Sequence, residues 1–450
     1  MVAIAKLPLS SHAPEQALAH DLRGPVPTGR YFAEVLALAP RLAGAGHVLN
    51  LCEDRYAFMV GLGAALVAGA PTLMPSSTAP SALAGLASRY PNLVGLHDEA
   101  ERPAELPPQM AALHVPDRWG ETLAWADAPM IAEDQLAVIM FTSGSQGAPT
   151  PHPKPWRTVC KYGMSELDTL GTAGMTIVAT VPAQHMFGFE YSTLFALHGG
   201  SSCWRGKPFY PSDVVAALAA TPRPRMLVIT PFHLSKVLDA GIPLPQCDAL
   251  VCATAPLSAQ LAARAESAFG APLREIYGST ECAQIACRRT SVEPDWQLVP
   301  GVTMEHDAAG TWVHGGHIEE RMLLSDVIEP TQSGRFRLAG RHADMVNIAG
   351  RRTSIDYLNA QLLSIDGVQD GCFVQPQADA QDGVQVTRLA ALCVAPGLDA
   401  GQVLAALRTR IDQVFLPRPL RLVAALPRND TGKLARGDLL ALLGAKEPGA

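Results

Sequence analysis

The sequence predicts an α/β protein with largely parallel sheets and at least two domains. Apolar runs of strand length alternate with stretches of helix length along most of the chain, which is typical of parallel sheets covered by helices. A chain of 450 residues is also too long for one ordinary hydrophobic core. Its 48% hydrophobic and 17% charged residues indicate a well-packed chain rather than a disordered one.

The first predicted elements are two helices and two short buried strands. Apolar residues recur with helical spacing in residues 31–44 and 57–68, and short apolar runs at His47–Leu51 and Pro71–Met74 predict strands. The uncharged segment Ala57–Met74 is the only candidate for a membrane span. Because glycines and a proline interrupt it, we expect a buried helix that leads into a strand, and no membrane span.

Further strands and a second domain are expected along the rest of the chain. Four apolar runs predict strands at Leu136–Phe141, Met175–Val181, Arg225–Thr230 and Leu250–Ala253. A β-rich end to the large domain is predicted from Thr311–Leu324 and Gly334–Leu338. The residues after it contain a predicted helix at Ile355–Leu363, strands and a terminal helix, which is enough for a small domain. We therefore expect a large domain at residues 1–339 and a small α+β domain at residues 340–450.

Charge and cysteine content argue against a nucleic-acid-binding protein and against a disulfide-stabilised one. A net charge of −7 gives no reason to expect a nucleic acid partner, so any phosphate must be bound by a local site. The nine cysteines are scattered without a CxxC pair, and their odd number argues against a disulfide framework. The N-terminal residues lack the apolar core of a signal peptide. We expect a cytoplasmic protein with reduced thiols.

The first candidate phosphate site is the loop Thr142–Pro149, which directly follows a predicted strand. Its glycines allow a tight turn with inward N–H groups, and its hydroxyls add donors, which suits a polyphosphate. The loop lacks the GK[ST] ending of a Walker motif. A simple turn after a strand is the alternative for this segment taken alone.

Two further segments carry candidate catalytic side chains. In the YGSTE segment, Tyr277 could stack on a purine, Thr280 could donate to a phosphate and Glu281 could hold Mg²⁺. The alternative for this segment is a surface turn with a capping threonine. Near the C-terminus, Lys433 follows a turn glycine and could reach into a cleft, although a lone lysine in such a place is usually solvated.

Taken together and in order, these segments resemble the acyl-adenylate-forming superfamily of acyl-CoA synthetases, peptide-synthetase adenylation domains and luciferases. The resemblance rests on FTSGSQGAP, AQHMFGFE, CATAPLS, YGSTE, LLSDVIE, GRHADMVNIAGRR and NDTGKLAR. It implies a large nucleotide-binding domain and a small mobile C-terminal domain that swings about a hinge. It also implies an enzyme that uses ATP and Mg²⁺ to convert a carboxylic acid into an acyl-AMP, and then transfers the acyl group to a thiol.

The resemblance assigns nucleotide contacts to residues of several matching segments. The residues implied to bind the β- and γ-phosphates of ATP are Thr142, Ser143, Gly144, Ser145 and Gly147. The residues implied to enclose adenine are Thr254, Ala255, Pro256 and Tyr277. The residues implied to hold the ribose are Asp326 and Arg341.

The resemblance also implies the catalytic residues and the substrate pocket. Thr280 would contact the α-phosphate, Glu281 would position Mg²⁺, and Lys433 would lie between the substrate carboxylate and the α-phosphate. Lysine and Mg²⁺ are needed because the attacking carboxylate is repelled by the phosphates and the transition state gains negative charge. The pocket would be lined by His185, Phe187 and Ile276, with a catalytic, gating role for His185.

The sequence departs from the family pattern in the phosphate loop and around the hinge. Gln146 stands where the family usually has threonine, and Thr150 stands where it usually has lysine. Lys154 is a candidate replacement for that lysine. Ala343 and Asn347 occupy hinge-side positions where a polar or charged residue and a lysine are usual.

A closer resemblance concerns the substrate and the thiol. The segment SGSQGAPTPHPKPW and the chain length resemble short stand-alone ligases of aryl polyene and xanthomonadin-type pigment pathways. That resemblance implies a hydroxybenzoate-like aryl acid and, because no phosphopantetheine site follows Lys433, a separate acyl carrier protein as acceptor. Two alternatives stay open: an aryl- or acyl-CoA synthetase that uses CoA, and a non-catalytic homologue that only binds nucleotide.

Overall fold

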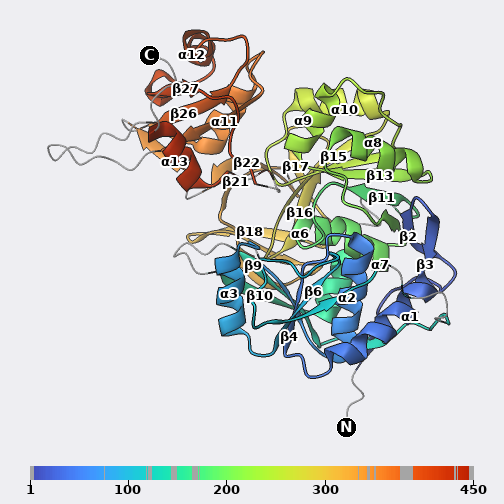
Figure 1. Cartoon of the computed structure of the whole chain (residues 1–450). Coiled ribbons are helices and arrows are strands. Elements are labelled where there is room, and N and C mark those ends of the chain that lie inside the picture. The colour runs from blue at the N-terminus through green and yellow to red at the C-terminus, as the bar shows by residue number, and fades with distance from the viewer. Residues whose placement is uncertain are drawn as a thin grey trace.

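The computed structural model describes most of the chain. The described residues are 5–75, 77–117, 119, 124–142, 149–164, 171, 173–332, 334–341, 345–348, 351–375, 389–429, 432 and 434–444, without the side chains of residues 341, 345, 347, 351 and 352. A large body built on two sheets carries a smaller group of elements at its C-terminal end (Figure 1).

The first large sheet has six strands, of which five run parallel. In spatial order it contains β10 (Thr150–Pro155), β9 (Leu136–Thr142), β5 (Thr72–Met74), β4 (His47–Asn50), β6 (Leu93–His97) and β7 (Ala111–His114). β10 lies at the edge and is antiparallel to β9. The strands expected at residues 47–51, 71–74 and 136–141 are therefore confirmed, and so is their parallel arrangement.

The second large sheet has eleven strands, with a parallel centre and antiparallel strands at both ends. In spatial order it contains β21 (Asp326–Gln332), β22 (Arg335–Arg341), β17 (Trp296–Leu298), β16 (Ala283–Arg288), β15 (Leu273–Ser279), β14 (Ala249–Cys252), β13 (Arg225–Ile229), β11 (Thr176–Ala179), β12 (Ser202–Trp204), β2 (Ala17–Asp21) and β3 (Gly24–Pro27). The parallel centre runs from β15 to β2. A separate two-stranded sheet pairs β1 (Lys6–Pro8) with β8 (Met130–Ala132).

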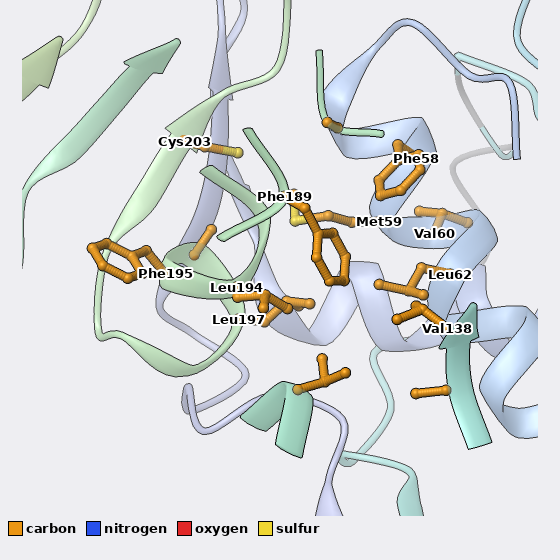
Figure 2. Packing of buried hydrophobic residues seen from close by; sticks show 14 of the residues in the cluster. Phe58, Met59, Val60, Leu62, Val138, Phe189, Leu194, Phe195, Leu197 and Cys203 are labelled. Atoms are coloured by element: carbon orange, nitrogen blue, oxygen red, sulfur yellow. The ribbon is translucent and has the colours of Figure 1, made fainter. Parts of the chain in front are cut away.

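Helices of the large body cover the two sheets and fill the space between them (Figure 1). They are α1 (Thr28–Leu38), α2 (Arg55–Ala68), α3 (Pro80–Arg89), α4 (Trp156–Met164), α6 (Met186–Gly188), a π-helix (Phe189–Leu194), α7 (Phe195–His198), α8 (Pro211–Ala220), α9 (Pro231–Asp239) and α10 (Ala259–Phe269). The largest hydrophobic cluster contains residues of α2, of the π-helix and of both sheets. Figure 2 shows this packing, in which the rings of Phe58 and Phe189 meet edge to face at 6.3 Å.

The uncharged stretch considered as a membrane span in the sequence forms the buried helix α2 and the strand that follows it. Nearly all of its residues are buried in the core between the two sheets, so the helix is apolar on every side. The side chain of Asp54 caps its first turn by accepting from the N–H of Ala57, and Gly69 ends it with φ 76°. Among the described residues, none of the helices is long and apolar enough to cross a membrane.

The first predicted helix differs from the observed one at its ends. The pattern predicts a helix over residues 31–44, whereas α1 begins at Thr28 and ends at Leu38. The following residues, Ala39–Leu42, form a 3₁₀ turn that contains Pro40. Because proline has no N–H and crowds the preceding turn, it ends the regular α-helical hydrogen bonding here.

The β-rich end of the large body is confirmed. Residues 311–324, predicted as strand, form two strands separated by a turn at Gly316 and His317. With a third strand they make the antiparallel sheet β18 (Thr303–Asp307), β19 (Gly310–Gly315) and β20 (Ile318–Leu323).

The elements after β22 form sheets and clusters of their own. They are β23 (Met345–Ile348), β24 (Arg351–Ser354), α11 (Ile355–Leu363), β25 (Asp370–Val374), β26 (Ala390–Val394), α12 (Ala400–Arg408), a 3₁₀ turn (Gln413–Phe415), β27 (Leu420–Leu422) and α13 (Arg436–Gly444). β23 pairs with β24, and β25, β26 and β27 form a three-stranded sheet. The helix expected at residues 355–363 is confirmed as α11. The domain division between residues 339 and 340 stays a prediction.

Candidate active site

Four of the predicted site segments follow the carboxyl ends of parallel strands in the two large sheets. Thr142 ends β9, His185 follows β11, Thr254 follows β14, and Thr280 follows β15. In open parallel sheets, ligands bind where the carboxyl ends of the strands meet loops. The fold therefore brings together segments that are far apart in the sequence.

Strand β10 directs two basic side chains toward the YGSTE turn. It reads TPHPKP, and side chains alternate between the two faces of a strand, so His152 and Lys154 share one face. The three prolines are compatible with a strand because β10 lies at the edge of its sheet. His152 and Lys154 therefore project from the same face of β10.

Both basic residues reach Glu281. The Nε2 atom of His152 lies 2.9 Å from the Thr142 hydroxyl and 3.5 Å from the Glu281 carboxylate. The ammonium of Lys154 donates to the main-chain carbonyl of Glu281 at 2.5 Å. Lys154 also lies over the ring of Tyr162, 5.9 Å from its centroid. His152 of β10 thus links Thr142, at the end of β9, to Glu281, the proposed metal ligand.

Burial lowers the pKa of both basic groups. It lowers the pKa of His152, an effect that Glu281 opposes and Lys154 reinforces. His152 is therefore mainly neutral at pH 7, and its contact with Glu281 is a polar contact rather than a full ion pair. Burial also lowers the pKa of Lys154, and acidic neighbours, including Cys282 and Glu281, oppose that shift.

The YGSTE segment forms the end of a strand and a hairpin turn. Tyr277 lies on β15, and Thr280 and Glu281 form the turn into the antiparallel strand β16. A turn does form at residues 280–282, as the alternative of a surface turn expects, and a strand rather than a helix follows it. The N–H of Cys282 donates to the Ser279 hydroxyl at 3.2 Å and closes the turn.

Tyr277, Asp326 and Arg341 come together, although about 50 residues separate the first two. The Tyr277 hydroxyl donates to the Asp326 carboxylate at 2.7 Å. Asp326 begins β21 directly opposite Arg341 in β22. The Tyr277 ring packs near Trp296 and Phe336, at centroid distances of 5.7 and 5.9 Å. Tyr277, implied to contact adenine, and Asp326, implied to hold the ribose, are therefore in direct contact.

Replacing Tyr277 with phenylalanine tests this cluster. The change removes the hydroxyl that holds the Asp326 carboxylate and keeps the ring. We expect KM for ATP to rise by about tenfold with little change in kcat, because one hydrogen bond to a charged group is lost. Steady-state release of pyrophosphate against ATP concentration gives both constants. Tyr210→Phe is the matched control, since Tyr210 is 65% exposed, and equal KM values for the two variants would contradict this role.

The adenine-side loop has a strained backbone. Thr254 adopts φ 84°, a left-handed conformation that is uncommon for residues other than glycine. Glu275 anchors the end of this loop by accepting from the N–H of Leu257 at 3.2 Å. The same carboxylate pairs with Arg288 at 2.7 Å. Ala255 and Pro256 lie between Thr254 and Leu257, so the loop is held on both sides of them.

The proposed substrate residues come from two elements. His185 is the residue before α6, and its main-chain carbonyl accepts from the N–H of Phe189. Phe187 is buried, and its ring lies 5.3 Å from that of Tyr191. Ile276 is buried on β15 and faces Cys287 of β16 across the hairpin.

Several predicted site residues lie outside the described residues. These are Ser143, Gly144, Ser145 and Gly147 of the phosphate loop, Lys433, and the atypical positions Gln146 and Ala343. The neighbourhood of Lys433 is partly visible, since a Cβ at Gly432 would lie 3.7 Å from that of Phe232 in α9. The guanidinium of Arg428 lies 5.9 Å from the centroid of the same ring.

The donor set at Glu281 suits Mg²⁺ with ATP. Within the described residues there is no group of three or more histidine, cysteine, aspartate or glutamate side chains that could hold a metal ion. A single carboxylate fits Mg²⁺, which keeps several waters and is usually held by one or two carboxylates together with substrate phosphates. Glu281 would supply the protein ligand.

Comparison with known proteins decides the family. Residues 32–309 match the family of AMP-binding enzymes. The chain belongs to this family. A 4-coumarate–CoA ligase of Cereibacter sphaeroides is 27% identical over 303 residues, which are 65% of this chain and 69% of that protein. An anthranilate–CoA ligase of Pseudomonas aeruginosa is 34% identical over 142 residues, which are 29% of this chain and 24% of that protein.

Solved structures share the fold of this AMP-binding enzyme. A benzoate CoA ligase of Burkholderia xenovorans matches with a TM-score of 0.79 and 19% identity, over 95% of this chain and 96% of that one. The o-succinylbenzoate CoA synthetase of Bacillus subtilis, in complex with its acyl-adenylate, matches with a TM-score of 0.79 and 17% identity, over 99% of this chain and all of that one. The AMP-binding enzyme is thus an ATP-using, AMP-forming acid–thiol ligase, as expected from the sequence.

Proposed function

We propose that this enzyme adenylates a hydroxybenzoate-like aryl acid and transfers the aroyl group to the phosphopantetheine thiol of a separate acyl carrier protein. The observation that carries the proposal is β10, whose His152 and Lys154 both contact Glu281. These two residues belong to the PHPK segment that resembles short aryl acid ligases. The names of the relatives, which refer to 4-coumarate, anthranilate and benzoate, support an aryl acid as the substrate class.

In the first step, a carboxylate oxygen attacks the α-phosphorus of ATP, and the bond to the bridging oxygen breaks to release pyrophosphate. Asp326 and Tyr277 hold the nucleoside, and Thr280 donates to the α-phosphate. Lys433 offsets the negative charge that develops between the carboxylate and the phosphate. Mg²⁺ held at Glu281 would supply further positive charge to the phosphates.

In the second step, a thiolate attacks the carbonyl carbon of the aroyl-AMP, a thioester forms, and AMP leaves. The nucleotide-binding groups hold the AMP while the thiol approaches. Lys154 has a supporting role, because its ammonium fixes the main chain of the turn that carries Glu281. The cytoplasmic location remains a prediction, supported by nine buried cysteines, none of which forms a disulfide among the described residues.

The second candidate function is an aryl- or acyl-CoA ligase, which the names of the relatives favour. An acceptor assay separates the two. The enzyme is incubated with ATP, labelled hydroxybenzoate and either CoA or a panel of holo acyl carrier proteins, with the apo carriers as controls. We expect kcat/KM for at least one holo carrier to exceed that for CoA by more than about tenfold. Faster transfer to CoA than to every carrier would establish the CoA ligase instead.

A further inference from the structure

A buried polar cluster includes Gln284 of β16, the second strand of the YGSTE hairpin. Its centre is Glu190, a residue of the π-helix that is only 3% exposed. The carboxyl group of Glu190 accepts from the main-chain N–H of Gln284. The side-chain carbonyl of Gln284 in turn accepts from the hydroxyl of Tyr191. π-Helical turns inside helices are frequent at functional sites.

Two atoms of this cluster lack hydrogen-bond partners among the described residues. They are the Oε1 atom of Glu190 and the Nε2 atom of Gln284, and both are fully shielded from solvent. A buried polar atom without a partner costs about 1–3 kcal/mol. Such atoms are rare in folded proteins and require an explanation, such as a ligand or a bound water. Here one acceptor and one donor are left open on two side chains that belong to the same cluster.

The cluster adjoins both segments proposed to bind the acid. Gln284 lies in β16 directly opposite Gly278 of the YGSTE segment. Tyr191 packs its ring against Phe187, one of the proposed pocket residues. Glu190 follows Phe187 by three residues in one continuous helical segment, so the two project from neighbouring positions of that segment.

The charge state of Glu190 suits a neutral ligand group. Burial raises the pKa of its carboxyl group to about 8, so the group is mainly protonated at pH 7 and adds no net charge. A protonated carboxyl can both donate and accept, and an amide nitrogen donates. A hydroxyl group is itself a donor and an acceptor, so it matches the acceptor and the donor that lack partners.

We propose that Glu190 and Gln284 recognise the ring hydroxyl of the aryl acid and so determine its selection over an unsubstituted acid. This inference rests on the proposed function, in that it requires an aryl acid to be the substrate. A site built to hydrogen-bond a substrate hydroxyl rejects the analogue without it strongly, because the buried polar groups then stay unpaired. Glu190 is therefore a specificity-determining residue and takes no part in the chemical step.

The test compares acids by the rate of ATP–pyrophosphate exchange. Benzoate and the 2-, 3- and 4-hydroxybenzoates are assayed with wild type, Glu190→Leu, Glu190→Gln and Gln284→Leu. For wild type we expect kcat/KM for the best hydroxybenzoate to exceed that for benzoate by about 100-fold or more. In Glu190→Leu this ratio should fall to about one, because the apolar side chain offers the hydroxyl no partner. Gln284→Leu should lower the hydroxybenzoate-to-benzoate ratio in part. Glu190→Gln keeps an acceptor oxygen and should retain most of that ratio.

The ratio of two acids on one enzyme sample does not depend on how much of the variant is folded. Glu34→Gln is the matched control, since Glu34 is equally buried but is bound to Arg30 and Tyr56 on α1 and α2. It should keep the wild-type ratio. If hydroxybenzoates are activated and Glu190→Leu keeps the wild-type ratio, the cluster holds only water and the inference is overturned while the proposed function stands. If acids of other classes support exchange and no benzoate does, the proposed function fails, and the inference fails with it.

Discussion

Glu281→Gln is expected to lower the rate of ATP–pyrophosphate exchange by about 10²–10³-fold. The change keeps the size of the side chain and leaves the main-chain carbonyl that accepts from Lys154. It removes the one negative charge that the turn offers to Mg²⁺. The amide also faces the His152 ring, 3.5 Å from the present carboxylate oxygen, so its orientation at the metal is less defined. Both effects act on the chemical step, and they should appear in kcat.

Two measurements make this expectation specific. Glu329→Gln, an exposed change on β21, should exchange at the wild-type rate. The unfolding midpoint of Glu281→Gln should match that of wild type, since a side chain that is 30% exposed contributes little as an ion pair. A stable Glu281→Gln protein with exchange within about threefold of wild type would exclude Glu281 as the metal ligand.

Arg55→Ala is expected to lower the free energy of unfolding by about 3–5 kcal/mol. Arg55 is the first residue of α2 and is only 1% exposed. Its guanidinium donates to the carbonyls of Ala179 and Val181 at 2.9 and 3.0 Å and to the Ser192 hydroxyl at 2.5 Å. It thereby ties α2 to the end of β11 and to the π-helix. Truncation leaves these acceptors unpaired and opens a cavity, and the two costs add.

Chemical unfolding of the two arginine variants measures this effect. Arg41→Ala is the matched control, because Arg41 is exposed in the 3₁₀ turn after α1, and its loss should change the free energy by less than about 0.5 kcal/mol. If Arg55→Ala and Arg41→Ala unfold at the same denaturant concentration, Arg55 does not tie α2 to β11 and the π-helix.

The parallel strands and buried helices are the part of the fold that local sequence predicts well. Apolar runs such as residues 136–141 have the composition and length of buried strands, and their order implies βα alternation. The buried helix α2 follows from an uncharged stretch with an aspartate before it and a glycine after it. Helix ends are predicted less well, because the capping aspartate and the helix-ending proline act outside the apolar pattern.

The parts of the site that depend on distant pairing were harder to predict. The motifs identify Tyr277 and Asp326 separately, but their hydrogen bond depends on the register of β15 and β21 in an eleven-stranded sheet. His152 was missed as a site residue because prolines on either side of it argue against a strand, although an edge strand tolerates them. The alternation of Thr150, His152 and Lys154 was the one available signal. Glu190 and Gln284 carry no sequence signal at all, since only the packed structure reveals their open atoms.

The order of the motifs indicates the family more strongly than any single motif does. The phosphate loop is the most atypical segment, and its central residues lie outside the described part of the chain. Among the described segments, Thr142 and Glu281 are linked through His152, and Tyr277 contacts Asp326. These contacts follow from the fold and support the site roles that the resemblance implies.

The most direct test of acid adenylation is ATP–pyrophosphate exchange over a panel of benzoates, cinnamates and fatty acids, with wild type, Lys433→Ala and the exposed-lysine control Lys236→Ala. We predict acid-dependent exchange by wild type and Lys236→Ala, highest with an aryl acid, and a loss of about 10²–10³-fold in Lys433→Ala. Equal exchange by Lys433→Ala and wild type, or no exchange with any acid, would contradict this prediction.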